Sequence, residues 1–146
     1  MRISSRGEYG LRALFDLALH YGSVPIPSAD IAARQKIPEA YLNQLLVSLR
    51  KAGLVRSTRG PGGGHELARP PADTDLAEAV VALEGTYAPA DDLHTPPAPD
   101  EPVENEILRE VWREVEQATA RVLLSISLED LCRRKQDRLQ EIMYYI

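Results

Sequence analysis

Apolar side chains recur at helical spacing along most of the chain, which predicts a mainly α-helical protein. The first predicted helix starts at a capping box, in which Ser5 caps the backbone and Glu8 reaches back to it, and it stops at Gly22. Its inward face is expected to carry Leu14, Leu17, Ala18 and Tyr21.

Two further helices follow in close succession. Ser28 is expected to cap a short helix, Lys36-Ile37-Pro38 forms a tight turn, and a third helix runs to Gly53. The third helix buries Leu42, Leu45, Leu46 and Leu49. Its outer face carries Glu39, Ala40, Asn43, Gln44, Ser48 and Lys51. A short helix, a tight turn and a helix with a polar outer face are typical of a helix-turn-helix.

The segment 54–67, LVRSTRGPGGGHEL, predicts two short strands around a glycine-rich tip, with Arg56 and Arg59 on one arm. The tip glycines, which permit a tight turn close to a sugar–phosphate backbone, are Gly60, Gly62, Gly63 and Gly64. The segment lacks the Lys-Ser/Thr ending of a P-loop. A basic hairpin behind a helix-turn-helix predicts a DNA-binding wing, and the alternative is an ordinary hairpin with surface arginines.

The second half begins with a helix between Asp75 and Gly85, and a loop rich in proline and acidic residues follows. A long helix from about Glu104 to Ile126 and a last helix capped by Ser127 complete the pattern. The expected organisation is a winged helix-turn-helix domain over 1–85, a loop over 86–103, and a dimerisation helix with a C-terminal helix and tail over 104–146.

Charge divides the chain in two. The net charge is −5, yet residues 1–70 hold 10 Lys/Arg and 5 Asp/Glu, whereas residues 71–146 hold 7 and 17. We expect the first half of the chain to face nucleic-acid phosphates.

One cysteine, no signal peptide and no long apolar run predict a cytoplasmic protein that does not engage a membrane. Because His20, His65 and His94 lie in unrelated segments and no nucleophile–base pair is evident, an enzyme is not expected.

Double-stranded DNA is the expected partner. Asn43 and Gln44 can each pair twice with adenine in the major groove, and Glu39 can accept from cytosine or favour the helix N-terminus. Arg59 can enter the minor groove. The remaining residues of the predicted DNA-binding set, several of them suited to phosphate contacts, are Ser28, Ala40, Tyr41, Ser48, Arg50, Lys51, Arg56 and the four tip glycines.

Three segments, MRISSRGEYGLRAL, IAARQKIPEAYLNQLLVSLRKAGLVRSTRGPGGGHELARP and LAEAVVALEG, resemble the Rrf family of winged-helix repressors, which includes the IscR, NsrR and CymR types. The resemblance covers nearly the whole chain. It implies that Ala40, Asn43 and Gln44 read bases and that Arg59 occupies the minor-groove position of the wing. Ala40 and Asn43 differ from the residues of IscR-type proteins, so the operator sequence does not carry over.

Many members of that family hold an iron–sulfur cluster on three cysteines in the loop before the long helix. The corresponding loop here, DDLHTPPAPDEPVE, has no cysteine, so no cluster and no other cofactor is expected. A metal site at His94 is a weak alternative. The cluster-free branch is the CymR type, which implies a repressor of cysteine metabolism.

The second half of the chain suggests two more partners, a second copy of the protein and an enzyme. The resemblance implies a homodimer, and the apolar stripe expected to form it includes Ile107, Leu108, Val111, Trp112, Val115 and Val122; a purely intramolecular core helix is the alternative. In the CymR branch, cysteine synthase (O-acetylserine sulfhydrylase) accepts peptides that end in isoleucine, so the tail Tyr144, Tyr145 and Ile146 is a candidate ligand for it. Alternatively the tail packs on the dimer.

Cys132 is a redox candidate, because nearby cations can lower a thiol pKa, but its place on the last helix fits a small buried hydrophobe equally well.

Overall fold

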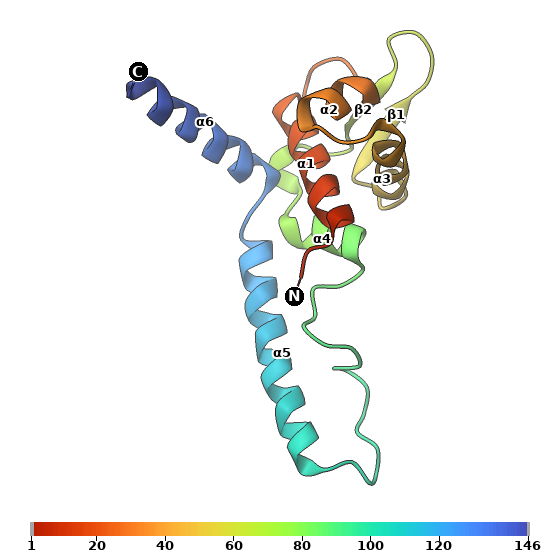
Figure 1. Ribbon diagram of the computed structural model, residues 1–146, viewed down its shortest axis with the longest axis vertical. Helices are drawn as coiled ribbons and strands as arrows, with labels where there is room; N and C mark the ends of the chain where they lie inside the picture. Colours follow the sequence, from red (N-terminus) through yellow and green to blue (C-terminus); the bar gives the residue numbers. More distant parts are fainter. Residues whose placement is uncertain (1, 146) are drawn as a thin grey trace.

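The computed structural model describes residues 2–145 and has the predicted mainly helical, winged helix-turn-helix architecture (Figure 1). The elements, in chain order, are α1 (Ser5–Leu19), α2 (Ser28–Gln35), α3 (Glu39–Lys51), β1 (Val55–Thr58), β2 (Gly64–Leu67), a 3-10 turn η1 (Pro71–Asp73), α4 (Leu76–Glu84), α5 (Val103–Leu124) and α6 (Leu128–Tyr144). Within the described residues, no helix combines the length and apolarity needed to cross a bilayer.

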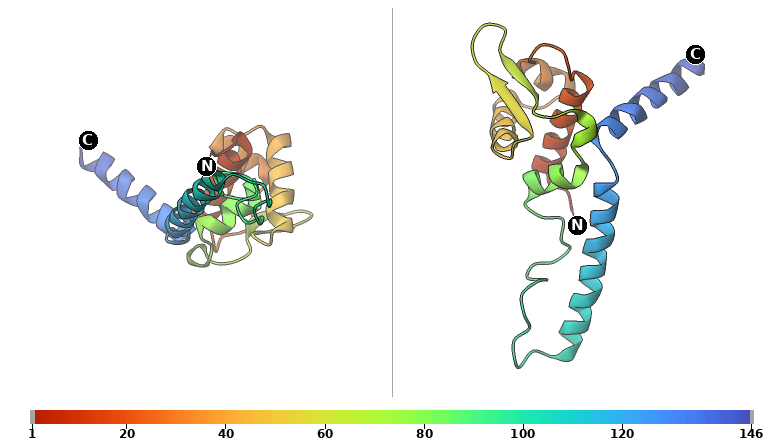
Figure 2. Two further views of the ribbon diagram at one scale, coloured as in Figure 1. Left: turned by 90° about the horizontal axis from the view of Figure 1, so that it is seen from below. Right: turned by 180° about the vertical axis from the view of Figure 1, so that it is seen from behind.

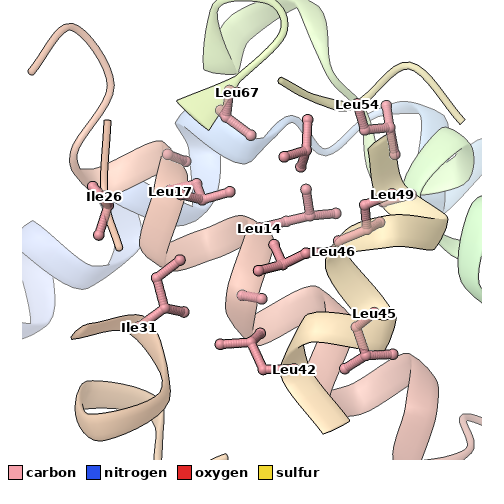
Figure 3. Close-up of a cluster of buried hydrophobic side chains, with 14 of the residues drawn as sticks. Leu14, Leu17, Ile26, Ile31, Leu42, Leu45, Leu46, Leu49, Leu54 and Leu67 are labelled. Atoms are coloured by element: carbon pink, nitrogen blue, oxygen red, sulfur yellow. The ribbon is translucent and has the colours of Figure 1, made fainter. Parts of the chain in front are cut away.

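The core lies between α1, α2, α3 and the wing. Leu14 and Leu17 of α1 face Leu46 and Leu49 of α3, and all four are at most 2% exposed. Figure 3 shows these side chains converging on one another beneath Leu67 of β2. Each fully buried leucine stabilises the fold by roughly 1.5–3 kcal/mol, so this packing holds the helix-turn-helix in place.

Two of the predicted helix starts are wrong by one residue. The N-cap of α1 is Ser4, whose hydroxyl accepts a hydrogen bond from the backbone N–H of Gly7 at 3.1 Å. Ser4 also donates from its backbone N–H and its hydroxyl to Glu84 of α4, at 2.9 and 2.7 Å. This contact with α4 favours Ser4 over Ser5. Ser28 is not a cap either, because it is the first residue of α2 and follows Pro27, which makes no side-chain cap.

Two glycines of α1 allow α4 to approach closely. A Cβ added at Gly10 would lie 2.3 Å from Cδ2 of Leu83, and one at Gly7 would lie 2.0 Å from a carboxylate oxygen of Glu84. Because real contacts at such distances do not occur, larger residues here would force the side chains of Leu83 and Glu84 to move.

The wing is a two-stranded antiparallel sheet in which Val55 pairs with Leu67 and Thr58 with Gly64. Its other edge meets the segment before α2, where Ile26 and His65 exchange backbone hydrogen bonds of 2.9 and 2.8 Å. β2 is therefore paired on both sides, with β1 and with the segment before α2, and the tip of the wing extends beyond these contacts.

In the second half, a long connection runs alongside α5 before joining its start (Figures 1 and 2). The connection between α4 and α5 has no regular helix or strand, as predicted, but it is packed against α5: Leu93 is 3% exposed, and Arg113 donates to its carbonyl oxygen at 2.9 Å. After α5 the chain returns to the body, where Leu128, at 0% exposure, joins the core and its N–H donates to the carbonyl of Thr74 at 2.9 Å. The rest of α6 then projects outward (Figure 2).

Candidate nucleic-acid interface

The outward face of α3 is open along its length. Opposite the buried leucines, the exposed side chains are Ala40, Asn43, Gln44, Val47 and Lys51. Val47 was missed at the level of sequence, although its spacing from Ala40 and Lys51 puts it at the middle of this face. An exposed valine among amides offers apolar contact to a thymine methyl group in the major groove.

One edge of α3 is already engaged with α1. Tyr41 is half-buried and packs edge-on against Tyr9, with ring centroids 5.7 Å apart. Ser48 accepts a hydrogen bond of 2.7 Å from the guanidinium of Arg6, which also donates to the carbonyl of Leu83 at 3.2 Å. These two members of the predicted DNA-binding set therefore anchor α3 as well, which leaves them less free than the residues of the outward face.

The start of α3 lies against the start of α2. The hydroxyl of Ser28 donates to the carboxylate of exposed Glu39 at 3.5 Å, so the two predicted contact residues form one polar cluster. Between the helices, Lys36 adopts the left-handed conformation, with φ of 54°. This conformation ends α2 sharply and sets the angle at which α3 begins.

Sequence reasoning missed the residue that joins α1 to α2. Asp16 is 1% exposed, and its carboxylate accepts two hydrogen bonds from Arg34, at 2.8 and 3.0 Å, and one from Gln35 at 2.9 Å. Burial raises the pKa of Asp16, but the hydrogen bonds from Arg34 and Gln35, together with the nearby charges of Arg34 and His20, outweigh it, so the pKa lies below its ordinary value. Asp16 therefore stays ionised and clamps α2 to α1.

The wing tip depends on its glycines for two different reasons. Gly60 and Gly62 have φ of 89° and 75°, which favours glycine, whereas Gly63 and Gly64 need space. A Cβ at Gly63 would lie 2.3 Å from the carbonyl oxygen of Thr58, and one at Gly64 would lie 2.5 Å from the backbone of Ile26. Gly64 is thus required for docking the wing onto the body.

Cations line the wing and the neighbouring end of α3. Arg59, directly after β1, is exposed at the tip, and Arg50 and Arg56 border a cleft between α3 and β1. Arg56 is held only loosely by Glu66, at 3.8 Å, and its side chain is 64% exposed. Together with Lys51 on α3, these side chains give this surface the positive character that a phosphate backbone requires.

His65, on β2, supports the wing. Its Nδ1 is 2.7 Å from the hydroxyl of Ser57 on the paired strand. Burial, and secondarily the charge of Arg50, lower the pKa of His65 below the ordinary 6.5. His65 is therefore neutral near pH 7 and links the two strands through Ser57.

The apolar stripe predicted on α5 is exposed in the single chain. Its residues and their exposed fractions are Ile107 54%, Leu108 51%, Val111 43%, Trp112 40%, Val115 38% and Val122 58%. The alternative of a purely intramolecular core helix is wrong, since α5 has no buried residue. Of the predicted tail, Tyr144 and Tyr145 are 85% and 86% exposed, and Ile146 lies outside the described residues.

The candidate metal ligand His94 and the candidate redox residue Cys132 lie in separate parts of the structure. Among residues 2–145 no group of three or more His, Cys, Asp or Glu side chains is placed to hold a metal ion. His94 pairs with Glu116 on α5 at 3.1 Å. The alternative of a cation-activated Cys132 finds no support: burial, and then the charge of Glu129, raise the pKa of its thiol, and Lys135 lowers it less.

Comparisons with known proteins agree with this geometry. The family model Rrf2, described as "Iron-dependent Transcriptional regulator", matches residues 3–134. Over 146 residues, which is all of both chains, the sequence is 36% identical to the HTH-type transcriptional regulator CymR of Bacillus subtilis (strain 168). It is 39% identical over 134 residues to Protein rrf2 of Nitratidesulfovibrio vulgaris, covering 91% of this chain and 88% of that one.

Two solved structures share the fold. The structure of CymR (YrzC), the global cysteine regulator of B. subtilis, has a TM-score of 0.76 at 35% identity and covers 92% of this chain and 98% of that one. The structure of T. potens IscR has a TM-score of 0.76 at 38% identity and covers 94% and 90%. The chain therefore belongs to the Rrf2 family of winged helix-turn-helix, DNA-binding transcriptional regulators.

Proposed function

We propose that the protein is a homodimeric repressor of the cysteine and sulfur metabolism type, which binds a pseudo-palindromic operator through α3 and the wing. The observation that carries the proposal is the outward face of α3, open along its length and flanked by the free wing tip with Arg59. The similarity of the whole protein chain to a cysteine regulator supports the assignment to cysteine and sulfur metabolism.

On this proposal α3 lies in the major groove. Asn43 and Gln44 present amides that can each donate to and accept from one adenine, and Val47 and Ala40 present methyl groups. Glu39, at the first turn, is held by Ser28 and accepts from a cytosine amine.

Contacts to the DNA phosphates position these base-contacting residues. Arg50, Lys51 and Arg56 suit the backbone beside the groove, and Arg59 suits the minor groove next to it. Gly60 and Gly62, whose Cβ positions meet no neighbouring atom, let the tip approach the sugar–phosphate backbone.

The homodimer is proposed to form through α5. Its exposed stripe includes Trp112 at the centre, and exposed contiguous apolar surface of this kind marks association sites in soluble proteins. Two copies of α3 would then be presented about one helical turn apart, roughly 34 Å, which matches a palindromic operator.

An iron–sulfur cluster does not fit the donors of this chain, although the family description names iron. Clusters of this family type need several thiolates, and the chain holds one cysteine, the half-buried Cys132 on α6, whose thiol pKa is raised. We therefore propose that the protein regulates transcription without a cluster.

Selection of bound sequences from random double-stranded DNA tests the operator proposal. We expect an inverted repeat, with Arg59→Ala weakening its binding and lowering the slope of log affinity against log salt by about one unit per chain. Arg133→Ala on α6, whose partner is Asp130, is the matched control and should bind as the unmodified protein does. Unchanged affinity and slope in Arg59→Ala would refute the wing assignment.

A second candidate function is docking of the C-terminal tail on cysteine synthase. It is favoured by the exposure of Tyr144 and Tyr145, which leaves the end of α6 free of the body. A terminal carboxylate with one apolar side chain is a common recognition unit. Deletion of Tyr145 and Ile146 should abolish pull-down of cysteine synthase, whereas Arg59→Ala should retain it. Survival of the pull-down after deletion would exclude the tail as the ligand.

A further inference from the structure

A groove of about 440 Å³ lies between the body and α6. α6 leaves the body on the side away from α3 and the wing, as both views in Figure 2 show. The groove is lined by three apolar side chains, one amide and three cations, namely Phe15, Leu19, Leu131, Gln35, Arg134, Lys135 and Arg138. Its volume is in the range of sites that hold small organic molecules.

The cations of the groove have no partner in the described chain. Arg134 and Arg138 are four residues apart, so they project from the same face of α6, and Lys135 lies next to them. No ion pair or hydrogen bond joins any of the three side chains to another residue within 2–145.

Of the acidic residues near the groove, Asp16 and Asp130 are paired with cations that do not line it, whereas Glu129 and Asp137 on α6 form no ion pair within residues 2–145. On α1, Asp16 is bonded to Arg34 and Gln35. On α6, Asp130 is paired with Arg133, and with Asp137 it lines a neighbouring hollow that Arg134 also borders. Three like charges beside an apolar floor repel one another, and an anion placed among them would relieve this repulsion.

We propose that this groove binds a small organic oxyanion, a carboxylate or sulfonate with an apolar body. The oxyanion lies between Arg134, Lys135 and Arg138, which supply charge-assisted hydrogen bonds, and the apolar body covers Leu19 and Leu131. Neither the anionic group nor the apolar body of the ligand suffices alone. Inorganic phosphate would leave the apolar floor of the groove uncovered, and a neutral apolar molecule would leave the cations unpaired.

The groove also adjoins the helix-turn-helix. Gln35 lines it, ends α2 and donates to Asp16 at 2.9 Å, while its backbone carbonyl accepts from Arg12 at 3.0 Å. A ligand in the groove therefore contacts the last residue before the turn that leads to α3, without approaching the DNA-binding surface itself.

Titration calorimetry of the full chain with 1-naphthoate tests the proposal, with its neutral analogue 1-naphthalenemethanol and inorganic phosphate as comparison probes. We expect one naphthoate site per chain, with the other two probes binding at least about tenfold more weakly. Arg134→Gln combined with Arg138→Gln should weaken naphthoate binding by about tenfold or more. Arg133→Gln, on the same helix outside the groove, should leave it unchanged. Nuclear Overhauser contacts from naphthoate to the methyl groups of Leu19 and Leu131 locate the site.

Equal binding of the neutral alcohol, or unchanged naphthoate affinity in the double variant, would overturn the proposal. So would naphthoate binding that appears only on dilution to monomers, with the double variant weakening the dimer, because the groove would then hold an acidic segment of a second copy. These measurements contain no DNA, so their failure is distinguishable from failure of the proposed operator binding.

Discussion

Replacing Asp16 by alanine removes the ionic clamp between α1 and α2. Three hydrogen bonds to a buried carboxylate are lost, and each such bond to a charged group contributes about 1.5–3 kcal/mol when one partner is deleted. Two effects reduce the sum: the Arg34 side chain is 40% exposed, so water re-solvates its guanidinium, and the cost of burying the carboxylate disappears. We expect a net destabilisation of about 2–3 kcal/mol.

Urea unfolding followed by circular dichroism measures this change. With a slope of about 2 kcal/mol per M, the midpoint of Asp16→Ala should fall by roughly 1–1.5 M at pH 7. Combining Asp16→Ala with Arg34→Ala in a double-mutant cycle gives the coupling free energy between Asp16 and Arg34. A coupling free energy below about 0.5 kcal/mol would refute the assignment of the loss to this contact.

The same substitution should show a defined dependence on pH. The folded pKa of Asp16 is lower than the 3.8 of a free carboxyl, so its stabilisation is present above about pH 4 and is lost as the pH falls through the folded pKa. The difference in stability between the unmodified protein and Asp16→Ala should therefore be constant at neutral pH and shrink in acid. A difference that stayed constant down to pH 2 would contradict an ionised clamp.

Three other predictions concern the wing and α5. Gly64→Ala should cost about 1–3 kcal/mol of unfolding free energy, because its Cβ would lie 2.5 Å from the backbone of Ile26, whereas Gly62→Asn, at φ of 75°, should be nearly neutral in the same urea titration. The imidazole of His65 should titrate below 6.5 by NMR, and because its folded pKa is lowered, its contribution to stability should be lost as the pH falls below 6.5; a midpoint at or above 6.5 would refute its burial. Trp112→Ala should weaken the dimer by about 30-fold or more in sedimentation equilibrium, and an unchanged dissociation constant would exclude α5 as the interface.

Local chemistry made much of the fold predictable. The leucine spacing of α3 and the capping box of Ser127 and Asp130 act within a few residues, so they can be recognised without tertiary contacts. The wing was predictable for the same reason: the tip glycines tolerate positive φ, which most other residues do not.

Contacts between distant segments decided the rest. Ser4 and Ser5 are equivalent candidates for the cap of α1, and Glu84, eighty residues away, selects Ser4. The buried clamp of Asp16 could not be recognised locally, because Arg34 and Gln35, which donate hydrogen bonds to its carboxylate, lie on a different helix.

Periodicity and turn chemistry are properties of neighbouring residues, so they indicate without tertiary contacts which segments become helices, where the wing turns and which face of α3 is polar. Which polar residues stay free depends instead on contacts between distant segments. Tyr41 and Ser48 look equivalent to Gln44 in the sequence, yet α1 engages them through Tyr9 and Arg6. The groove beside α6 exists for the same reason, since a helix from the end of the chain packs on one from its beginning.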